Sequence, residues 1–246
     1  MFSDRKVPTA QIIIIGNEIL TGKYADQNGP YLIHRLRQLG VDVVAIHTIP
    51  DVIETISDHI RRAKDAVDWV LTTGGVGPTH DDVTMQAVAE ALDVSLKPDK
   101  DLQEKMQARF GQPLSEGFER MTNLPEGCAL WWEGDVAFPL VVCENVLVFP
   151  GVPFLLQRKF EAIAYRLGGE PVQTRRVMLD AKETDIAFAL EAIQNANPDV
   201  SIGSYPRRSD TGWFIVLTIE SRDETALQTC TATIENAFST YVMDAD

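Results

Sequence analysis

The sequence predicts an α/β protein with a mostly parallel sheet, followed by a small α+β domain. In the first part of the chain, short β-branched apolar runs alternate with amphipathic stretches, which is the pattern of right-handed βαβ units. After the Gly-Gly-Glu-Pro run at 168–171, the predicted order changes to strand, helix, strand, strand, helix. We therefore expect one domain over residues 8–168 and a second over residues 171–246.

The first domain is expected to begin with strands that are each followed by a helix. The isoleucine run after Gln11 is apolar on both faces, which is typical of a strand buried in a parallel sheet. Gly40 marks the end of the first helix, and Asp51 and Glu54 have the spacing of a capping box for the second. The predicted strands are residues 11–15, 41–49 and 69–73, and the predicted helices surround residues 32–39, 53–63 and 83–92.

The rest of the chain is expected to form shorter elements. Residues 111–127 are polar and are interrupted by glycine and proline, so we expect an irregular segment that could fold over a site. Pro153 suits the first turn of a helix. The other expected elements are a helix at 101–110, a hairpin at 130–143, a strand at 146–149, a helix at 153–167, strands at 174–179, 200–205 and 212–220, a turn at 210–212, and helices at 183–195 and 224–241.

A glycine-rich loop links the third predicted strand to the third predicted helix. Gly74, Gly75 and Gly77 would let the backbone approach a phosphate, because glycine has no Cβ. The N–H groups of the first helical turn would favour an anion, and Thr79 would add a hydroxyl. No lysine follows at the P-loop position, and the spacing is not GxGxxG. The loop therefore predicts a phosphate site of another kind.

Two adjacent acids, Asp81 and Asp82, lie where this helix is expected to begin. Either could cap the helix by accepting backbone N–H bonds. One cap would explain only one aspartate, so we also expect at least one of the pair to face the ligand through a divalent metal or a water molecule. His80 could polarise a phosphate oxygen or could be an ordinary exposed loop histidine.

A further turn, after the first predicted strand, should lie at the same edge of the sheet as the glycine-rich loop, since ligands bind outside the carboxyl ends of parallel strands. Another tight turn precedes the helix expected at 153–167. The first contains Gly16 and Glu18 and leads to Asn28. Glu18 could be a base, a metal ligand or a turn contact, and Asn28 could contact a ribose or phosphate or only cap its helix. The second turn contains Gly151 and could be a rigid loop or a second wall of the pocket.

The composition excludes several classes of partner. The formal net charge is −14, from 36 acidic and 22 basic residues, so the surface repels nucleic acid and offers little to an anionic membrane. No apolar run is long enough to span a membrane, and the N-terminus lacks the apolar region of a signal peptide. The three cysteines are widely spaced, which favours reduced structural thiols in a cytoplasmic protein.

Several motifs carry a family resemblance: Gly16-Asn17-Glu18-Ile19-Leu20-Thr21-Gly22, Asp26-Gln27-Asn28, Thr73 to Thr84, and Pro150-Gly151-Val152-Pro153. In order and spacing they resemble the molybdopterin-binding-like domain family, to which the N-terminal domain of competence/damage-inducible protein CinA and, closer still in wording, a domain of eukaryotic FAD synthases belong. The strings Leu96-Lys97-Pro98 and Phe138-Pro139-Leu140-Val141 also resemble the matching domain of eukaryotic FAD synthases. The helix after Pro153 reads Phe154-Leu155 where many CinA members have Glu-Met, so no carboxylate role is expected there.

The resemblance implies a three-layer α/β/α fold with a pocket for a phosphorylated nucleotide or pterin. It also implies metal-dependent hydrolysis of ADP-ribose or FAD (with Co, Mn or Mg). In such a reaction we expect Asp81 and Asp82 to hold the metal or orient the water, and Glu18 to be the base or another ligand. The alternatives are a non-hydrolytic molybdopterin-binding or molybdopterin-adenylyl transfer protein, and self-association through the C-terminal domain into a homo-oligomer. Because the chain ends at Asp246, we expect neither NMN deamidation nor FAD formation.

Overall fold

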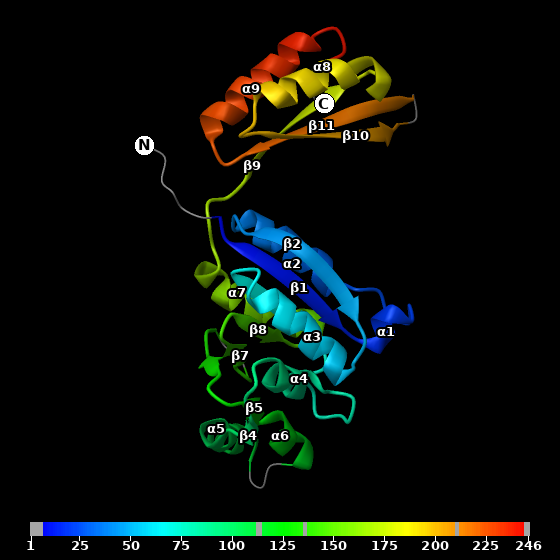
Figure 1. Cartoon of the computed structure of the whole chain (residues 1–246). Coiled ribbons are helices and arrows are strands. Elements are labelled where there is room, and N and C mark those ends of the chain that lie inside the picture. Colours follow the sequence, from blue (N-terminus) through cyan, green and yellow to red (C-terminus); the bar gives the residue numbers. More distant parts are fainter. Residues whose placement is uncertain (1–6, 112–114, 135–136, 210–211, 244–246) are drawn as a thin grey trace. The chain divides into compact units, whose positions relative to one another are not determined.

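The computed structural model describes residues 7–111, 115–134, 137–209 and 212–243. The chain divides into two compact units, Met1–Gly169 and Glu170–Asp246. In each unit, helices pack against a sheet of its own (Figure 1).

The first unit is built on a six-stranded sheet in the order β2-β1-β3-β8-β7-β6. The first four strands in this order are parallel to one another, and β7 runs antiparallel to both of its neighbours, β8 and β6. The predicted, mostly parallel sheet is confirmed. The bounds are β1 Thr9–Ile15, β2 Asp42–Ile49, β3 Trp69–Thr73, β6 Ala129–Trp131, β7 Leu140–Cys143 and β8 Val146–Phe149.

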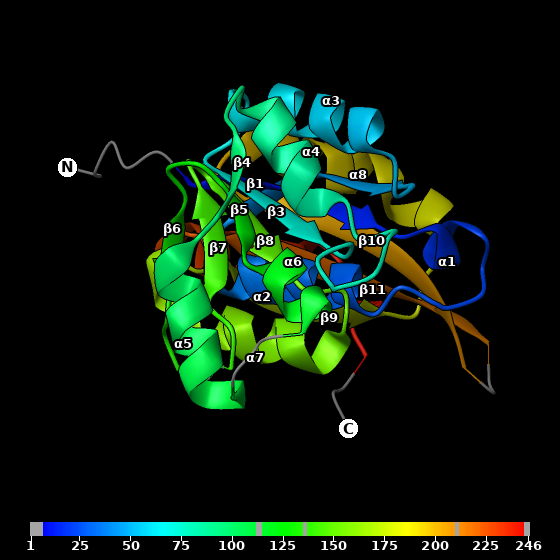
Figure 2. The ribbon, with the colours of Figure 1, turned by 90° about the horizontal axis from the view of Figure 1, so that it is seen from below.

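Helices cover both faces of this sheet (Figure 2). The helices α2 (Asn28–Gln38) and α7 (Pro153–Ile163) pack on one face, and α3 (Ile53–Lys64) and α4 (Thr84–Ala91) pack on the other. Successive side chains of β1 alternate between the two cores, and all four isoleucines of the run are at most 3% exposed. A continuous apolar run is therefore the pattern that a strand in the middle of three layers requires.

Short elements complete the first unit, and one prediction about them is wrong. Residues 111–127 are not irregular throughout, because they include a helix and a strand that pairs with β4. The helix begins at Ser115, whose side chain accepts a hydrogen bond from the Phe118 N–H, a cap signal that the neighbouring glycines and prolines outweighed in the sequence. These elements are α1 Asn17–Leu20, β4 Leu96–Pro98, α5 Lys100–Phe110, α6 Glu116–Met121, β5 Asn123–Pro125 and a 3₁₀ turn at Ala164–Arg166.

The second unit is a three-stranded antiparallel sheet in the order β10-β11-β9 with two helices. Its core is formed by apolar side chains of the sheet, such as Leu179 and Leu217, packed with apolar side chains of the helices, such as Ile234 on α9. The small α+β layer that we predicted is confirmed, while the turn at 210–212 lies largely outside the described residues. The bounds are β9 Gln173–Leu179, α8 Glu183–Ala196, β10 Ser201–Arg208, β11 Trp213–Ser221 and α9 Glu224–Ala237.

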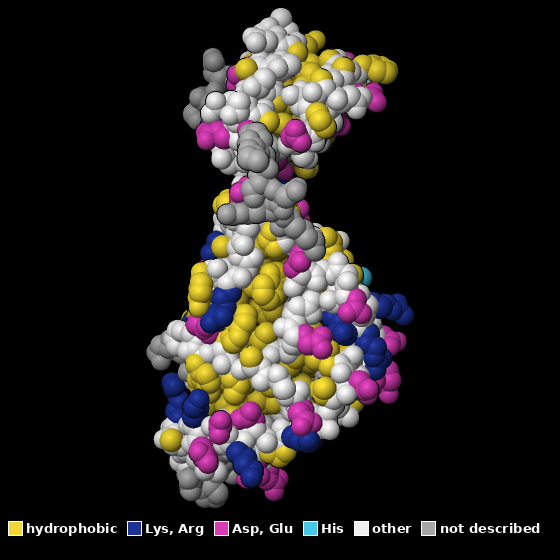
Figure 3. All heavy atoms as spheres, turned by 60° about the vertical axis from the view of Figure 1, so that its left-hand side comes forward, with side chains coloured by type: hydrophobic (Ala, Val, Ile, Leu, Met, Phe, Trp, Pro, Cys, Tyr) yellow, Lys and Arg dark blue, Asp and Glu magenta, His cyan; other side chains and the backbone are white. Residues whose placement is uncertain are grey.

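Charged side chains of both signs are interspersed on the face of the first unit that Figure 3 shows, around a stretch of apolar side chains. On this face, no broad patch of lysine and arginine stands apart from the acids.

Lys159 on α7 leads to a prediction about pH dependence. Its Nζ donates hydrogen bonds to the carbonyls of Phe138 and Pro139, and burial lowers the pKa of Lys159 to about 8. The unfolded chain then binds more protons than the folded chain between about pH 8 and the ordinary lysine pKa of about 10.4. We expect the free energy of unfolding, compared with that of Lys159→Met, to rise through this window by at most about 3 kcal/mol. Urea titrations of both proteins at several pH values measure this difference in the free energy of unfolding. A difference that falls between about pH 8 and about pH 10 would contradict the prediction.

Candidate anion-binding site at the carboxyl edge of the parallel strands

The loops that follow the parallel strands meet at one edge of the first sheet. Backbone hydrogen bonds join them directly: the Gly16 N–H donates to Ile49 O at 3.1 Å, and the Gly74 N–H donates to Phe149 O at 3.2 Å. The turns after β1, β2, β3 and β8 are thus fixed to one another, as their positions at the carboxyl ends of parallel strands predicted.

Gly74 lies where three of these loops touch. Its φ is +107°, and a Cβ built on it would be 2.0 Å from the carbonyl oxygen of Ile15. A Cβ on Gly151 would in turn be 3.2 Å from the Cα of Gly74. Only glycine fits at Gly74, because both its backbone conformation and its surroundings exclude a side chain. Its N–H already has a partner in Phe149, so the expected phosphate contact from this N–H is not available.

The next glycines are better placed to hold an anion. Within the described residues, the N–H groups of Gly75 and Gly77 have no hydrogen-bond partner. Thr84, which is fully buried, fixes the loop from the other side: its hydroxyl donates to Gly74 O at 2.8 Å, and its N–H donates to Gly75 O at 3.0 Å. The loop is therefore held in shape by α4 while its own N–H groups at two glycines remain available.

Asn28 connects two of the loops from inside the protein. It is 6% exposed, and its Nδ2 donates to Thr73 Oγ1 at 2.9 Å and to Gly151 O at 2.8 Å. The Thr73 hydroxyl donates onward to Pro150 O at 3.0 Å. Asn28 does not cap α2, since the carboxylate of Asp26 accepts the N–H of Asn28 at 2.9 Å. Its side chain positions the turns rather than facing the solvent-exposed rim.

The adjacent aspartates do not act as a pair. Asp82 Oδ2 accepts two hydrogen bonds from Thr79, one from its N–H at 2.8 Å and one from its hydroxyl. Asp82 therefore stabilises the turn between Thr79 and Asp82. The Asp81 side chain is 65% exposed. Neither residue caps α4, whose N-cap is Val83 without a side-chain hydrogen bond, so the cap interpretation is wrong for both. His80 is 93% exposed on its side chain, as an ordinary loop histidine would be.

From the sequence, Asp51 was expected mainly to cap a helix, with a place in the pocket as the lesser alternative. It is not part of a capping box, because α3 has Val52 as its N-cap and no side-chain cap. Instead, Asp51 Oδ2 accepts the Asn17 N–H at 2.8 Å, and Oδ1 is 3.5 Å from the position of a Cβ on Gly75. Its place directly after β2, at a carboxyl strand end, was the signal that could have identified it.

The ionisation of Asp51 depends on its burial and on two neighbouring acids. Burial raises the pKa of Asp51, and the charges of Glu18 and Asp81 raise it further. Glu18 bends back over Gly16, with Oε1 2.7 Å from the position that a Cβ would occupy there. Mutual repulsion of this kind shows that the acids of the turns after β1, β2 and β3 lie close enough to interact.

A cation from the 111–127 segment completes the rim. Arg120 on α6 donates from Nη1 to Thr79 O at 3.0 Å and to Pro78 O at 3.4 Å. This segment therefore does fold against the glycine-rich loop. The two enclose a hollow of about 150 Å³, lined by Gly75, Val76, Gly77, His80, Asp82, Val83, Met85, Gln86, Leu96, Arg120, Met121 and Asn123.

The expected metal has no ready site. Among the described residues, no three His, Cys, Asp or Glu side chains are grouped so that they could hold a metal ion. At the predicted position, Asp82 is hydrogen-bonded to Thr79, and the side chain of Asp81 is 65% exposed. The donor set in this conformation does not fit a divalent cation, which requires several oxygen ligands at once.

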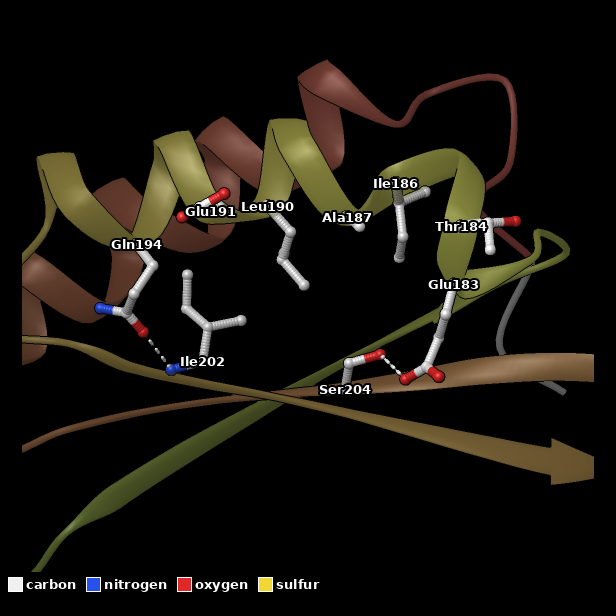
Figure 4. A pocket seen from close by; sticks show the side chains of 9 residues that line it. All are labelled: Glu183, Thr184, Ile186, Ala187, Leu190, Glu191, Gln194, Ile202 and Ser204. Atoms are coloured by element: carbon white, nitrogen blue, oxygen red, sulfur yellow. Dashed lines mark hydrogen bonds between the residues drawn. The ribbon is translucent and has the colours of Figure 1, made fainter.

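The second unit has a larger hollow of about 470 Å³ between α8 and β10 (Figure 4). Leu190, Ile186 and Ile202 line it, and Ser204 donates a hydrogen bond to Glu183 at one end. Gln194 closes the other end, where Oε1 accepts the Ile202 N–H at 2.9 Å. No residue that the sequence identified for chemistry lies here.

Comparison with protein families divides the chain at the same place as its structure. Residues 11–170 match the family model described as "Probable molybdopterin binding domain". Residues 171–246 match the model described as "FAD synthase, middle domain". Over the described part of the chain, none of the helices combines the length and apolarity that a membrane crossing needs.

Relatives of known sequence are similar over most of this chain. A protein of Archaeoglobus fulgidus is 34% identical and covers 87% of this chain and 90% of its own length. A protein named "Probable FAD synthase" from Caenorhabditis elegans is 30% identical over 100% of this chain and 53% of its own length. A "CinA-like protein" of Frankia casuarinae is 30% identical over 94% of this chain and 58% of its own. The chain thus spans about half the length of the latter two relatives.

The first unit also resembles a solved structure. The crystal structure of the protein CinA from Thermoplasma acidophilum matches with a TM-score of 0.61 and 25% identity, over 65% of this chain and 98% of that one. The similarity in fold and sequence extends to the unit that carries the glycine-rich loop.

Proposed function

We propose that this protein hydrolyses a nucleotide diphosphate of the FAD or ADP-ribose type. The premise is that the chain belongs to the molybdopterin-binding domain family and carries a C-terminal domain that matches the FAD synthase middle domain. One observation carries the proposal: the unpaired N–H of Gly75 belongs to a residue beside the carboxylate of Asp51, and the unpaired N–H of Gly77 follows it in the same loop. A phosphate acceptor site and a base are the two parts that hydrolysis of a pyrophosphate linkage needs.

The roles follow from the contacts. The Gly75 and Gly77 N–H groups and Arg120 would bind one phosphate of the substrate and neutralise its charge. Asp51, with its raised pKa, would take a proton from the attacking water, and Glu18 or Asp81 would orient that water. Asp82 and Asn28 would act as positioning residues, because their polar atoms hold the loops and not a ligand.

A divalent metal is an expected participant that the present side-chain arrangement does not accommodate. The proposal therefore assigns water activation to a carboxylate of the chain and makes metal dependence a result of the assay. If Asp81 and Asp82 do bind Co, Mn or Mg, both must first turn from their present positions, and activity in a chelator should then be lost.

The test is release of AMP from FAD and from ADP-ribose by the purified protein, with each metal and with chelator. We expect Asp51→Asn, Glu18→Gln and Asp81→Asn to lower kcat by about 100-fold, as for loss of a general base. Asp65→Asn is the matched control, since Asp65 is 80% exposed and follows α3 at the opposite edge of the sheet. Absence of AMP under every condition, or equal loss in Asp65→Asn, would reject the proposal.

The family description favours a second candidate, a protein that binds molybdopterin or transfers an adenylyl group to it without hydrolysis. The same N–H groups would then hold the pterin phosphate. Co-purification of a fluorescent pterin, together with no AMP release, would support this reading over hydrolysis. A homo-oligomer stays a prediction, which gel filtration of the full chain tests.

A further inference from the structure

Two cysteines that the site does not use lie opposite each other in the first sheet. The register of β6 and β7 pairs Ala129 with Val142, so the next pair along the ladder is Cys128 with Cys143. Both side chains belong to the same core cluster as Leu130 and Val141, which places them on one face of the sheet. All three cysteines of the chain are free.

The backbone geometry brings these two residues close together. Cys143 pairs with Val146 across a two-residue turn, so it directs its backbone N–H and C=O towards β8. The Cys128 N–H likewise donates to Pro125 O and not to β7. Cys128 and Cys143 therefore form a non-hydrogen-bonded pair, whose Cα atoms are about 4.5 Å apart in antiparallel sheets. Disulfides span Cα distances of about 4.4–6.8 Å, so the pair lies at the short end of the permitted range.

We propose that Cys128 and Cys143 are a reversible thiol oxidation site, which closes to a disulfide between β6 and β7 under mild oxidants such as peroxide or oxidised glutathione. The short separation allows the bond with little backbone movement. Because Cys128 is only partly buried, a reducing thiol can reach the bond and open it again. This inference does not depend on the proposed function, because Cys143 lies at the opposite end of β7 from the turn around Gly151.

The two thiols differ in the way that such a reaction requires. A hydrogen bond with Cys143 lowers the pKa of Cys128, which is only partly buried. The hydrogen bond with Cys128 and burial both raise the pKa of Cys143, which is 3% exposed. Cys128 is therefore the thiolate that meets an oxidant first, and Cys143 is the resolving thiol.

The chemistry balances with peroxide as the oxidant. The Cys128 thiolate attacks one peroxide oxygen and becomes a sulfenic acid, while the second oxygen leaves as hydroxide and takes up a proton to form water. The Cys143 sulfur then attacks the sulfenic sulfur, the S–O bond breaks, and a second water leaves. Together the two thiols lose two electrons and two protons, and the peroxide is reduced to two waters.

The experiment uses the full chain, treated with hydrogen peroxide or with glutathione buffers of stated ratio. We expect intact mass to fall by two hydrogen atoms, and non-reducing peptide mapping to join the peptides of Cys128 and Cys143. Cys230 is the internal control: it is fully buried in the second unit and should stay free. Dithiothreitol should restore the mass.

Two variants make the outcome decisive. In Cys143→Ser, we expect no crosslink, while Cys128 should still form a sulfenic acid that dimedone traps. In Cys128→Ser, neither product should form at peroxide concentrations that oxidise the wild type fully. A crosslink to Cys230, over-oxidation of Cys128 without a crosslink in the wild type, or a bond that persists in reduced glutathione alone would each overturn the proposal.

Discussion

Gly74→Ala is expected to destabilise the first unit by about 3 kcal/mol or more and to abolish binding at the glycine-rich loop. The new methyl group would lie 2.0 Å from the carbonyl oxygen of Ile15, at a φ of +107° that L-residues rarely adopt. Since the obstacle is backbone and not a flexible side chain, the loop must move, and the N–H groups of Gly75 and Gly77 must move with it. Urea unfolding and titration with FAD measure the two effects.

Gly127→Ala is the matched control for this substitution. Gly127 also has a positive φ, +83°, but a Cβ there would meet nothing within 4 Å. Only the cost of the left-handed conformation remains, about 1 kcal/mol, and binding should be unchanged. Equal losses of stability and binding in the two variants would mean that the close contact with the Ile15 carbonyl does not contribute to the effect of Gly74→Ala.

Asn28→Asp is expected to cost about 3 kcal/mol at neutral pH, although it changes the shape of the side chain very little. It replaces the two donated hydrogen bonds, to Thr73 and to the Gly151 carbonyl, with a buried carboxylate that faces a carbonyl oxygen. The protonated carboxyl can still donate one bond, so its folded pKa will be raised above the unfolded value. A group of this kind stabilises at low pH and loses the contribution as pH rises.

The defect of Asn28→Asp should therefore be smaller at pH 4 than at pH 7, in urea unfolding followed by circular dichroism. Asn236→Asp, an exposed position on α9, makes the same chemical change and should stay within about 0.5 kcal/mol of the wild type. A defect in Asn28→Asp that grows on acidification would show that the amide is not the donor to Gly151.

Much of the fold could be predicted because it depends on local pattern. Four consecutive isoleucines can only serve a strand covered on both sides, and the alternation with helical stretches then requires a parallel sheet. The edge at which the loops gather follows from the same topology. The glycine-rich loop and the turn around Gly16 could thus be grouped from sequence alone, whereas the turn around Gly151 kept two alternatives, a rigid loop or a pocket wall.

The details that could not be predicted depend on contacts between distant segments. Asp51 and Glu54 have the spacing of a local cap, but the partner of Asp51 is Asn17, 34 residues away. The Gly74 N–H donates its hydrogen bond to the Phe149 carbonyl, which lies next to it only because β8 is the neighbour of β3 in the sheet. Arg120 lies in a stretch whose glycines and prolines masked a capped helix. None of these contacts could be predicted from the periodicity of apolar residues in the sequence.

The contact of Gly74 with Ile15 and Gly151 also limits how this protein could acquire a different ligand preference. Three main chains meet there without side chains between them, so lengthening any one turn would separate the others. New selectivity would instead have to come from side chains around the hollow, such as Met85, Gln86, Arg120 and Asn123. A library randomised at those positions should yield folded proteins with altered ligands, whereas insertions after β1, β3 or β8 should yield mostly insoluble ones.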